Sequence, residues 1–416
     1  MAAKHQAPKG TFDVLPADEA ARAVVSAAAR ERLRAAAYAR IETPIFEDTG
    51  LFERGVGEST DIVRKEMFTF EDQGRRSVTL RPEGTAPVCR AYIEHGMHRL
   101  PQPVKLAYEG PFFRYERPQE GRFREFNQIG AEAIGSASPL LDAELIILLD
   151  RILTDVGIPD AELLLSSLGS PEARADYRDE LRDFLRDHES DLSDEVRERI
   201  DSNPMRAFDS DHAATKTVME NAPRMLDRLG GEDAEHFAAV RELLDEAGVA
   251  YTLDGSLVRG LDYYNRTVFE FTCDRLGAQS GLGGGGRYDG LVELLGGPAT
   301  PAVGWAAGVE RILLAMETRP EPEPIDVFVV TGSDRAAASA LVRRLRDEGL
   351  AADLDLAERS FKGQMKQADR SRARHAIILE GDGTAKLRDM SSGEQRDVDP
   401  GAIATELVAM SETARP

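Results

Sequence analysis

The chain has 416 residues, of which 42% are hydrophobic and 30% are charged, a composition typical of a folded protein with two or three domains. No apolar run approaches the roughly 20 residues that span a bilayer, and the N-terminus lacks the apolar segment of a secretion signal. The two cysteines, Cys89 and Cys273, are too few for a disulfide framework or a cysteine-rich zinc site. We therefore expect a cytoplasmic protein with no membrane partner.

The formal net charge is −22, and lysine supplies only eight of the 52 basic residues. An acidic, lysine-poor surface stays hydrated in a salt-rich cytoplasm, where salt screens the repulsion between its charges. The composition therefore favours a salt-adapted organism over the alternative, an ordinary acidic protein. A nucleic-acid partner is compatible with this charge, because local basic patches decide such binding.

The N-terminal part of the chain is expected to alternate helices with short strands. Its helices are expected at residues 18–40, 87–95 and 140–155, and its strands at residues 41–46, 65–70, 78–81, 104–113 and 123–134. The first of these strands is assigned because Thr43 precedes Pro44, which disfavours the helical region. The last two strands flank a polar loop at 117–121 and therefore predict a β-hairpin.

The middle of the chain changes in composition. Residues 160–247 contain 11 basic and 24 acidic residues at helical spacing, interrupted by prolines, so we expect an inserted helical segment there. Strand character returns at 249–253 and 257–273. A helix is expected from 303 to 316, because the apolar residues near its end fall on one helical face.

Residues 319–324 have the proline spacing of an extended linker. They predict a boundary between a first domain, residues 1–320, and a second domain, residues 325–416. The second domain alternates strands with helices, as expected for a small α/β domain.

The predicted hairpin carries the side chains of a nucleotide clamp. Arg114 and Glu116 lie two residues apart and so share one face of a strand, while Arg122 and Phe126 flank the other side of the loop. An arginine can bind a phosphate through two hydrogen bonds, a glutamate can accept from an aminopurine, and a phenylalanine can stack on the base. The alternative is a solvated, charged hairpin with an ordinary core aromatic.

A second candidate lies where a strand bends into a helix around Gly84. Glu83 and Thr85 are placed there to bind the ammonium, hydroxyl or carboxyl groups of a ligand. The alternative is a helix terminus, which Thr85 caps and whose dipole Glu83 favours.

Polar side chains on two further predicted strands fit an imidazole. Gln128 and Glu132 point to the same side of one strand, whereas Tyr263 and Tyr264 point to opposite sides of another. A glutamate and a tyrosine hydroxyl across a small pocket could hold both ring nitrogens of an imidazole. The alternative is a satisfied polar pair in the core. Arg259 begins the second strand, and a buried arginine needs an acid or a bound anion.

The glycine-rich stretch at 281–286 literally fits the pattern Gly-x-Gly-x-x-Gly. We exclude a dinucleotide-binding fold, because no parallel strand–turn–helix unit surrounds the pattern. Arg311 lies on the helix expected after this stretch, where it could reach a terminal phosphate.

Together these segments resemble the class II aminoacyl-tRNA synthetases. Residues 41–44, 113–126 and 304–311 resemble the three motifs of that class, and residues 259–264 (Arg-Gly-Leu-Asp-Tyr-Tyr) and 285–290 (Gly-Gly-Arg-Tyr-Asp-Gly) resemble two segments peculiar to histidyl-tRNA synthetase. Residues 9–13 and 80–85 fit as well, and residues 359–369 resemble the anticodon-binding domain of that family. The resemblance covers essentially the whole chain.

The resemblance implies an α+β fold, with a class II catalytic domain on an antiparallel sheet, a helical insertion at about 160–247, and a C-terminal α/β anticodon-binding domain. It implies a homodimeric histidine–tRNA ligase that uses ATP and Mg²⁺. The enzyme would activate L-histidine to histidyl-adenylate and pyrophosphate, and then transfer histidine to the 3′ end of tRNA(His).

Roles for single residues also follow from the resemblance. It implies that histidine is bound by Glu83, Gly84, Thr85, Gln128, Glu132, Tyr263 and Tyr264. It implies that ATP is bound by Arg114, Glu116, Arg122, Phe126 and Arg311, and that Arg114 and Arg259 act on the α-phosphate from opposite sides. It assigns no residue as a metal ligand.

Two positions depart from the family pattern: Asn127 stands where a histidine or tyrosine is common, and residues 282–284 are a glycine-heavy variant of the usual loop. The main alternative is a non-catalytic, synthetase-like regulatory subunit of histidine biosynthesis. Such proteins lack the anticodon-binding domain and have lost some substrate-contacting residues. This chain has the residues of that domain and all of the substrate-contacting residues named above. A prolyl or threonyl synthetase is disfavoured by Glu132 and by residues 259–264.

Overall fold

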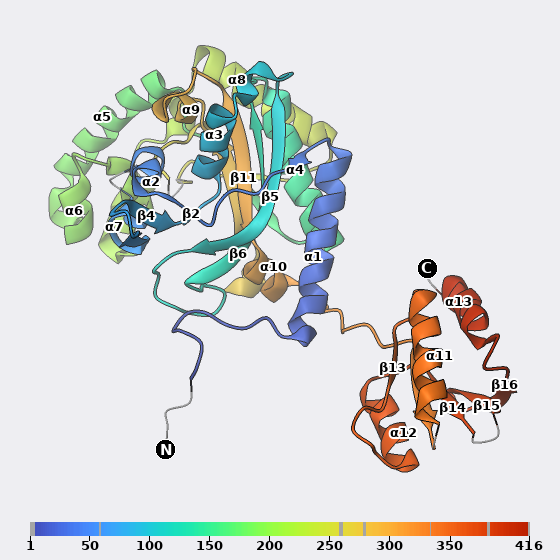
Figure 1. Cartoon of the computed structure of the whole chain (residues 1–416). Coiled ribbons are helices and arrows are strands. Elements are labelled where there is room, and N and C mark those ends of the chain that lie inside the picture. Colours follow the sequence, from blue (N-terminus) through green and yellow to red (C-terminus); the bar gives the residue numbers. More distant parts are fainter. Residues whose placement is uncertain are drawn as a thin grey trace. The chain divides into compact units, whose positions relative to one another are not determined.

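The computed structural model describes residues 5–57, 60–257, 261–277, 280–332, 334–380 and 383–414. The chain forms two compact units, Met1–Pro320 and Glu321–Pro416 (Figure 1). None of the helices in this described part of the chain has the length and apolarity needed to span a membrane.

The first unit is built on an eight-stranded sheet, in the order β1-β5-β6-β11-β10-β9-β7-β8. Its strands are β1 (Ala39–Arg40), β5 (Val104–Phe113), β6 (Glu125–Ile134), β7 (Glu162–Ser167), β8 (Thr252–Leu253), β9 (Asn265–Thr272), β10 (Gly281–Arg287) and β11 (Ala302–Gly308). All neighbours from β5 to β7 are antiparallel, and only the short edge strands β1 and β8 pair in parallel. The expected antiparallel catalytic sheet is therefore confirmed.

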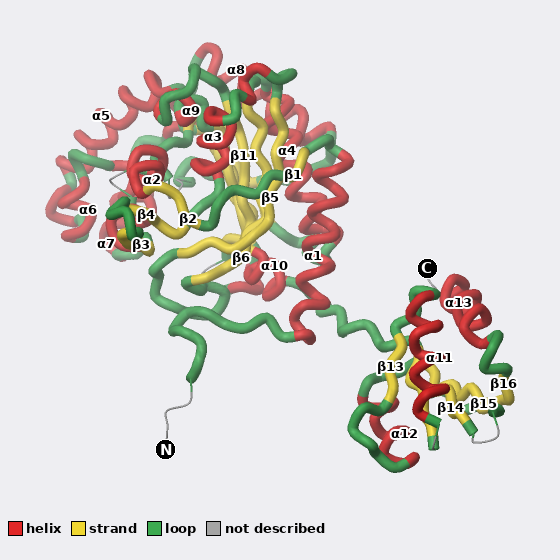
Figure 2. The backbone as a smooth tube through the Cα atoms, in the orientation of Figure 1, coloured by secondary structure: helices red, strands yellow, loops and turns green. Residues whose placement is uncertain are grey.

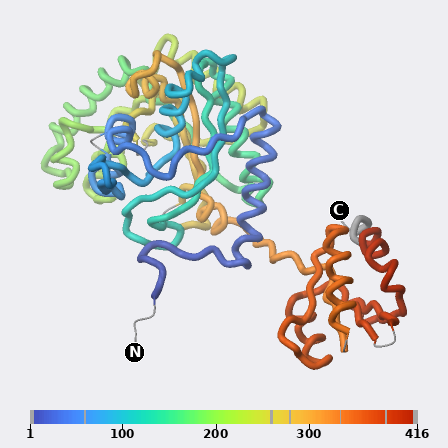
Figure 3. The backbone as a smooth tube through the Cα atoms, in the orientation of Figure 1, coloured from blue at the N-terminus to red at the C-terminus, as the bar shows by residue number. Residues whose placement is uncertain are grey.

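Four helices cover one face of this sheet: α1 (Pro16–Ala35), α4 (Pro139–Asp155), α8 (Gly231–Glu246) and α10 (Val309–Ala315). Their apolar sides share one core with inward-facing strand residues such as Ile129, Phe271 and Trp305. Helices α1 and α10 are far apart in the sequence but lie side by side (Figure 3). Helix α4 begins where its sequence predicts, because Pro139 occupies the first turn and the Ser138 hydroxyl accepts from the Leu140 N–H.

The opposite face of the sheet carries smaller elements. They are α2 (Thr49–Val56), the π-helical turn η1 (Ile62–Glu66), α3 (Thr85–Glu94), η2 (Met97–Arg99), α9 (Leu291–Leu294) and a small sheet of β2 (Phe46–Asp48), β4 (Ser77–Leu80) and β3 (Phe68–Glu71). The short turn η6 (Asp274–Leu276) packs instead against α10. The helical segment between β7 and β8 contains α5 (Pro171–Asp187), η3 (Glu189–Asp191), α6 (Asp194–Arg199), η4 (Pro204–Asp209), α7 (Ala213–Glu220), η5 (Met225–Arg228) and α8.

Several expected boundaries were wrong. Helix α1 ends at Ala35 rather than 40, because Ala37 adopts a positive φ of 64° before β1 begins. The helical segment does not start at 160, since 162–167 form β7 of the central sheet. Residues 302–308 form β11 rather than the start of a helix, and β9 begins only at Asn265.

The second unit is a five-stranded sheet with helices on both faces (Figure 2). Its elements are β12 (Val327–Thr331), α11 (Arg335–Asp347), β13 (Ala352–Leu354), α12 (Phe361–Arg370), β14 (His375–Leu379), β15 (Ala385–Asp389), β16 (Gln395–Val398) and α13 (Ile403–Ala414). Helices α11 and α13 pack on the face that carries Val327 and Ile377, and α12 packs on the face that carries Phe328 and Ile378. This is the α/β fold expected from the alternating pattern.

Candidate active site

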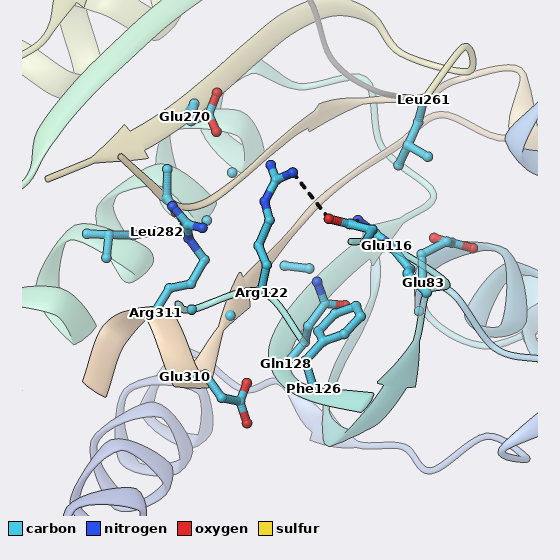
Figure 4. A pocket seen from close by; sticks show the side chains of 18 of the residues that line it. Glu83, Glu116, Arg122, Phe126, Gln128, Leu261, Glu270, Leu282, Glu310 and Arg311 are labelled. Carbon is cyan, nitrogen blue, oxygen red and sulfur yellow. Dashed lines mark hydrogen bonds and ion pairs between the residues drawn. The ribbon is translucent and has the colours of Figure 1, made fainter. Parts of the chain in front are cut away.

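A cavity of about 360 Å³ lies on the face of the large sheet opposite α4 and α8 (Figure 4). The structure brings eleven of the predicted site residues to its wall: Glu83, Gly84, Thr85, Arg114, Glu116, Arg122, Phe126, Gln128, Tyr263, Tyr264 and Arg311. Glu132 is fully buried and contacts the wall residue Thr85. Arg259 lies outside the described residues, so the structure gives it no position.

The floor of the cavity consists of residues with small side chains. Strand β10 supplies Gly281, Gly283 and Gly284, and the neighbouring strand β11 supplies Ala306 and Gly308. Sequence propensity missed β10, because glycine is disfavoured in strands. The strand pairs in antiparallel fashion on both sides, which agrees with the exclusion of a dinucleotide-binding fold.

The hairpin arginines surround a single glutamate. Arg122 lies 3.2 Å from the Glu116 carboxylate and Arg114 lies 3.9 Å from it. Figure 4 shows the ion pair between Arg122 and Glu116 as a dashed line. Arg114 also donates through Nε to the Pro82 carbonyl at 2.9 Å, with its guanidinium 5.4 Å from the centre of the Phe126 ring. Residues 114–116 follow the end of β5 rather than lying within it as expected.

A further cation, Arg311, lies on the same side of the cavity as Arg122 (Figure 4). Arg311, on α10, donates through Nε to the Gly281 carbonyl. Burial lowers the pKa of Arg311, and the positive charge of Arg122 lowers it further. No carboxylate forms an ion pair with Arg311 among the residues that the structure describes. Two neighbouring arginines whose charges repel one another would be stabilised by a bound polyanion.

The start of α3 is organised by Glu83 rather than by Thr85. The Glu83 carboxylate accepts the N–H groups of Thr85 and Ala86 at 2.7 and 2.9 Å, which caps the helix. Burial raises the pKa of Glu83, although these two hydrogen bonds oppose the shift. The Thr85 hydroxyl is thereby released from capping, and it donates to Glu132 at 2.8 Å.

Glu132 is held by three hydroxyl groups. Oε1 accepts from Thr85 at 2.8 Å and from Tyr108 at 3.2 Å, and Oε2 accepts from Tyr288. Burial raises the pKa of Glu132 to about 8, while the hydrogen bonds from Tyr288, Thr85 and Tyr108 act in the opposite direction. Sequence reasoning missed Tyr108 and Tyr288, because they lie 24 and 156 residues away from Glu132 in the chain.

Tyr263 and Tyr264 do not point to opposite sides of a strand. They lie in a turn before β9, their ring centres are 4.7 Å apart, and both line the cavity. The Tyr263 hydroxyl is 3.4 Å from Glu83. Gln128 lines the same cavity, and its Oε1 is buried with no hydrogen-bond donor among the described residues. An acceptor in this state indicates a ligand group that donates to it.

Two polar clusters hold the strands around the cavity in place, and the first of them includes the wall residue Glu310. Glu310, on α10, accepts from Arg22 at 2.9 Å, from the Asn127 backbone N–H at 2.9 Å and from the Asn127 side-chain amide at 3.2 Å, so the unusual Asn127 ties β6 to α10. Arg287 is fully buried at the end of β10 and contacts both Asp142 and Asp289, the latter at 2.9 Å.

The Arg287 cluster extends into the helical segment. Asp142 also contacts Nε2 of His236, on α8, at 2.7 Å. On the same helix, Asp233 contacts Arg266 at 3.1 Å. Among the described residues, no group of three or more histidine, cysteine, aspartate or glutamate side chains is placed to hold a metal ion.

Comparisons with known proteins agree on one family. A family model described as histidyl-tRNA synthetase matches residues 10–312, and a model described as anticodon binding domain matches residues 326–410. A histidine–tRNA ligase from Halothermothrix orenii is 46% identical over 404 residues, which cover 94% of this chain and 96% of that protein. A histidine–tRNA ligase from Rubrobacter xylanophilus is 47% identical, with 95% and 97% covered.

A solved structure supports the same assignment. The crystal structure of apo histidyl-tRNA synthetase from S. aureus is similar to this chain with a TM-score of 0.82 and 36% identity. The similarity covers 97% of this chain and all of the S. aureus chain.

Proposed function

This chain belongs to the histidyl-tRNA synthetase family and has the activity of a histidine–tRNA ligase, and from that premise we propose how its cavity binds the two small substrates. The observation that carries the proposal is the convergence on one cavity of an arginine-rich end and an end lined by Glu83, Gln128 and two tyrosines. ATP would occupy the first end and histidine the second.

At the ATP end, the hairpin would clamp the nucleotide. Phe126 would stack on the adenine, and Glu116 would accept from its amino group. Arg122 and Arg311 would bind the β- and γ-phosphates, which would replace the Glu116 carboxylate as the partner of Arg122. Binding of a polyanion would also remove the electrostatic cost of holding Arg122 near Arg311.

At the histidine end, Glu83, Gly84, Thr85 and Gln128 would bind the amino-acid backbone. Gln128 Oε1, which has no donor among the described residues, would accept from the ammonium group, and Glu83 supplies a buried acid in the wall of the same cavity. Glu132 and Tyr264 would hold the imidazole, with Tyr263 lining the pocket. Buried polar groups that pair with two ring nitrogens reject side chains that would leave them unpaired.

The first reaction forms a bond between the histidine carboxylate and the α-phosphorus of ATP, and pyrophosphate leaves. Such a step needs alignment and charge stabilisation rather than a strong base. Arg114 would stabilise the α-phosphate from the hairpin side, and Arg259 from the other side. Mg²⁺ would neutralise the leaving pyrophosphate. Mg²⁺ is usually held by substrate phosphates together with one or two protein carboxylates. The carboxylates of Glu116 and Glu270 line the cavity and could serve in this way.

The second reaction transfers histidine to tRNA. The 3′-terminal ribose hydroxyl of tRNA(His) would attack the carbonyl carbon of the adenylate, and AMP would leave. We assign the adenylation site to residues 1–320 with their helical insertion, and anticodon binding to residues 325–416. The match of residues 326–410 to the anticodon-binding family model supports the second assignment.

We also propose a homodimer formed through the region of α1 and β1. Strand β1 is the edge of the sheet, and beside it an apolar cavity of about 350 Å³ opens between α1 and β5. Ile45 and Phe46 are 47% and 55% exposed nearby in the sequence. A second copy would cover these groups. Light scattering should give the mass of a dimer, and Phe46→Glu should shift the protein toward monomer; a monomeric parent chain would refute the proposal.

We propose that the protein acts in the cytoplasm, where tRNA is charged. We also propose that this cytoplasm is rich in salt, because the chain has a net charge of −22 and only eight lysines. Localisation of a tagged chain in its own cells tests the first point, and the salt dependence of melting tests the second.

The experiment that tests the proposed site is amino-acid-dependent exchange of pyrophosphate into ATP, in high KCl and across all twenty amino acids. We expect exchange with histidine alone in the parent chain, and its loss in Arg114→Ala and Glu132→Gln. Exchange that survives both substitutions would contradict the assignment of this cavity.

A further inference from the structure

The Glu132 side chain is enclosed by residues from other segments of the chain. We call this enclosure the socket. Glu132 is fully buried, and the register of the sheet places it directly opposite Gly304 of β11. A Cβ atom at Gly304 would lie 1.6 Å from Oε2 of Glu132. The side chain of Glu132 therefore occupies the space that a side chain at position 304 would need.

The ring of Tyr108 closes the socket from a second direction. A Cβ atom at Gly84 or at Gly130 would approach the Tyr108 ring to 2.5 Å or 2.3 Å. Tyr108 therefore packs directly over two glycine backbones, and its hydroxyl reaches Oε1 of Glu132 at 3.2 Å.

Tyr288 closes it from a third direction and is itself firmly anchored. Its hydroxyl donates to Oε2 of Glu132, its backbone N–H donates to the Ala302 carbonyl, and its ring packs edge-on against Tyr263. The preceding residue, Arg287, donates to the carbonyls of Ser136 and Ser138 as well as to two carboxylates. The strand end that carries Tyr288 therefore has little freedom to move.

We propose that Tyr108 and Tyr288 are positioning residues, which together with Thr85 fix the orientation of the Glu132 carboxylate before histidine binds. This inference rests on the proposed role of Glu132 in holding the imidazole. Two oxygens that already accept three hydroxyl hydrogen bonds present one remaining direction to the ligand. A fixed carboxylate loses little entropy on binding, so the two hydroxyls act on histidine affinity without touching the substrate.

The other titratable groups near Glu132 are Glu83, whose charge raises the pKa of Glu132, and Cys89, Tyr38 and Tyr263, which interact with it electrostatically. Tyrosine-to-phenylalanine substitutions leave all of these in place. They also retain the buried rings, so packing is kept while a single donor to Glu132 is removed.

The test compares Tyr288→Phe and Tyr108→Phe with the matched control Tyr177→Phe. Tyr177 is equally buried, but its hydroxyl donates to the Pro223 carbonyl within the helical segment, at 3.0 Å. The assay is pyrophosphate exchange with the whole chain, with KM for histidine, KM for ATP and kcat measured between pH 6 and pH 9 in buffers chosen to span the pKa of Glu132 at about 8.

We expect each of the two variants to raise KM for histidine about 10- to 150-fold, the value of a hydrogen bond to a charged group, with KM for ATP unchanged. Loss of a donor also raises the pKa of Glu132, so the pH at which histidine affinity changes should move upward in both variants. Tyr177→Phe should alter neither quantity.

The Glu132→Gln variant distinguishes failure of the positioning role from failure of the proposed role of Glu132 itself. If it loses histidine-dependent exchange while both tyrosine variants keep the parent KM and pH profile, the positioning role is wrong and the proposed function stands. If Glu132→Gln itself keeps the parent KM for histidine, the proposed role of Glu132 fails, and the inference fails with it.

Discussion

The substitution Gly304→Ala is the sharpest test of how tightly the imidazole end of the cavity is built. The added Cβ would lie 1.6 Å from Oε2 and 2.5 Å from Cδ of Glu132, where ordinary contacts begin at 3.4 Å. It would also lie 2.7 Å from the Ala131 carbonyl, which belongs to the backbone of β6 and cannot rotate away. The carboxylate must therefore leave its socket, or the two strands must separate.

Either response breaks hydrogen bonds to Glu132. Overpacking of a core costs about 1–3 kcal/mol, and a lost hydrogen bond to a charged group costs about 1.5–3 kcal/mol. We expect a loss of about 3 kcal/mol of histidine binding, which corresponds to a rise in KM for histidine of about 150-fold. KM for ATP should stay near the parent value, because Gly304 does not line the ATP end.

The assay is pyrophosphate exchange at saturating ATP with histidine varied, together with a thermal melt. Gly230→Ala is the matched control, because a Cβ there meets no atom within 4 Å and its φ of −143° suits any residue. A Gly304→Ala protein with the parent KM for histidine and the parent melting temperature would refute the socket.

Three further predictions follow from the site and the surface. Arg311→Ala should raise KM for ATP about 10- to 150-fold, the value of a charged hydrogen bond, with KM for histidine unchanged; an unaltered KM for ATP in steady-state exchange would exclude Arg311 as a phosphate ligand. The pKa of Glu132 rises from 4.5 to about 8 on folding, so the folded state holds this proton more tightly and its stability should fall as pH rises from about 5 to 9. In urea titrations, the free energy of unfolding should fall less with rising pH in Glu132→Gln than in the parent chain. An equal fall in both proteins would contradict this prediction. The melting temperature should rise with KCl, since salt screens repulsion within a chain of net charge −22; equal melting temperatures with and without KCl would refute the salt-adapted surface.

The elements with regular patterns were predictable from the sequence. The hairpin of β5 and β6 follows from two apolar-rich runs around a polar loop, and the structure brings Arg122 and Phe126 of this hairpin to one cavity. The second unit also followed from its alternation of strands and helices. In these segments the local pattern and the tertiary structure favour the same state.

The errors have a common physical cause, which is that tertiary contacts decided the local structure. Strand β10 consists mainly of glycine and has no strand propensity, yet it pairs on both sides within the sheet. Residues 261–264 have the apolar and aromatic character of a strand but form a turn. The partners of Glu132 were out of reach for the same reason, since Tyr288 approaches it only after β10 and β6 are brought together by β11.

The contacts of α8 limit how this enzyme can be rebuilt. The helix belongs to the helical segment by sequence, yet it buries Phe237, Val240 and Leu244 in the core of the catalytic sheet. Its His236 completes the cluster around Asp142 that anchors β10. If the whole segment were deleted, in a chimaera or a minimal enzyme, that cluster would be exposed to water. The strand end that bears Tyr288 would then lose part of its support. Any such variant must therefore keep α8 together with the active site.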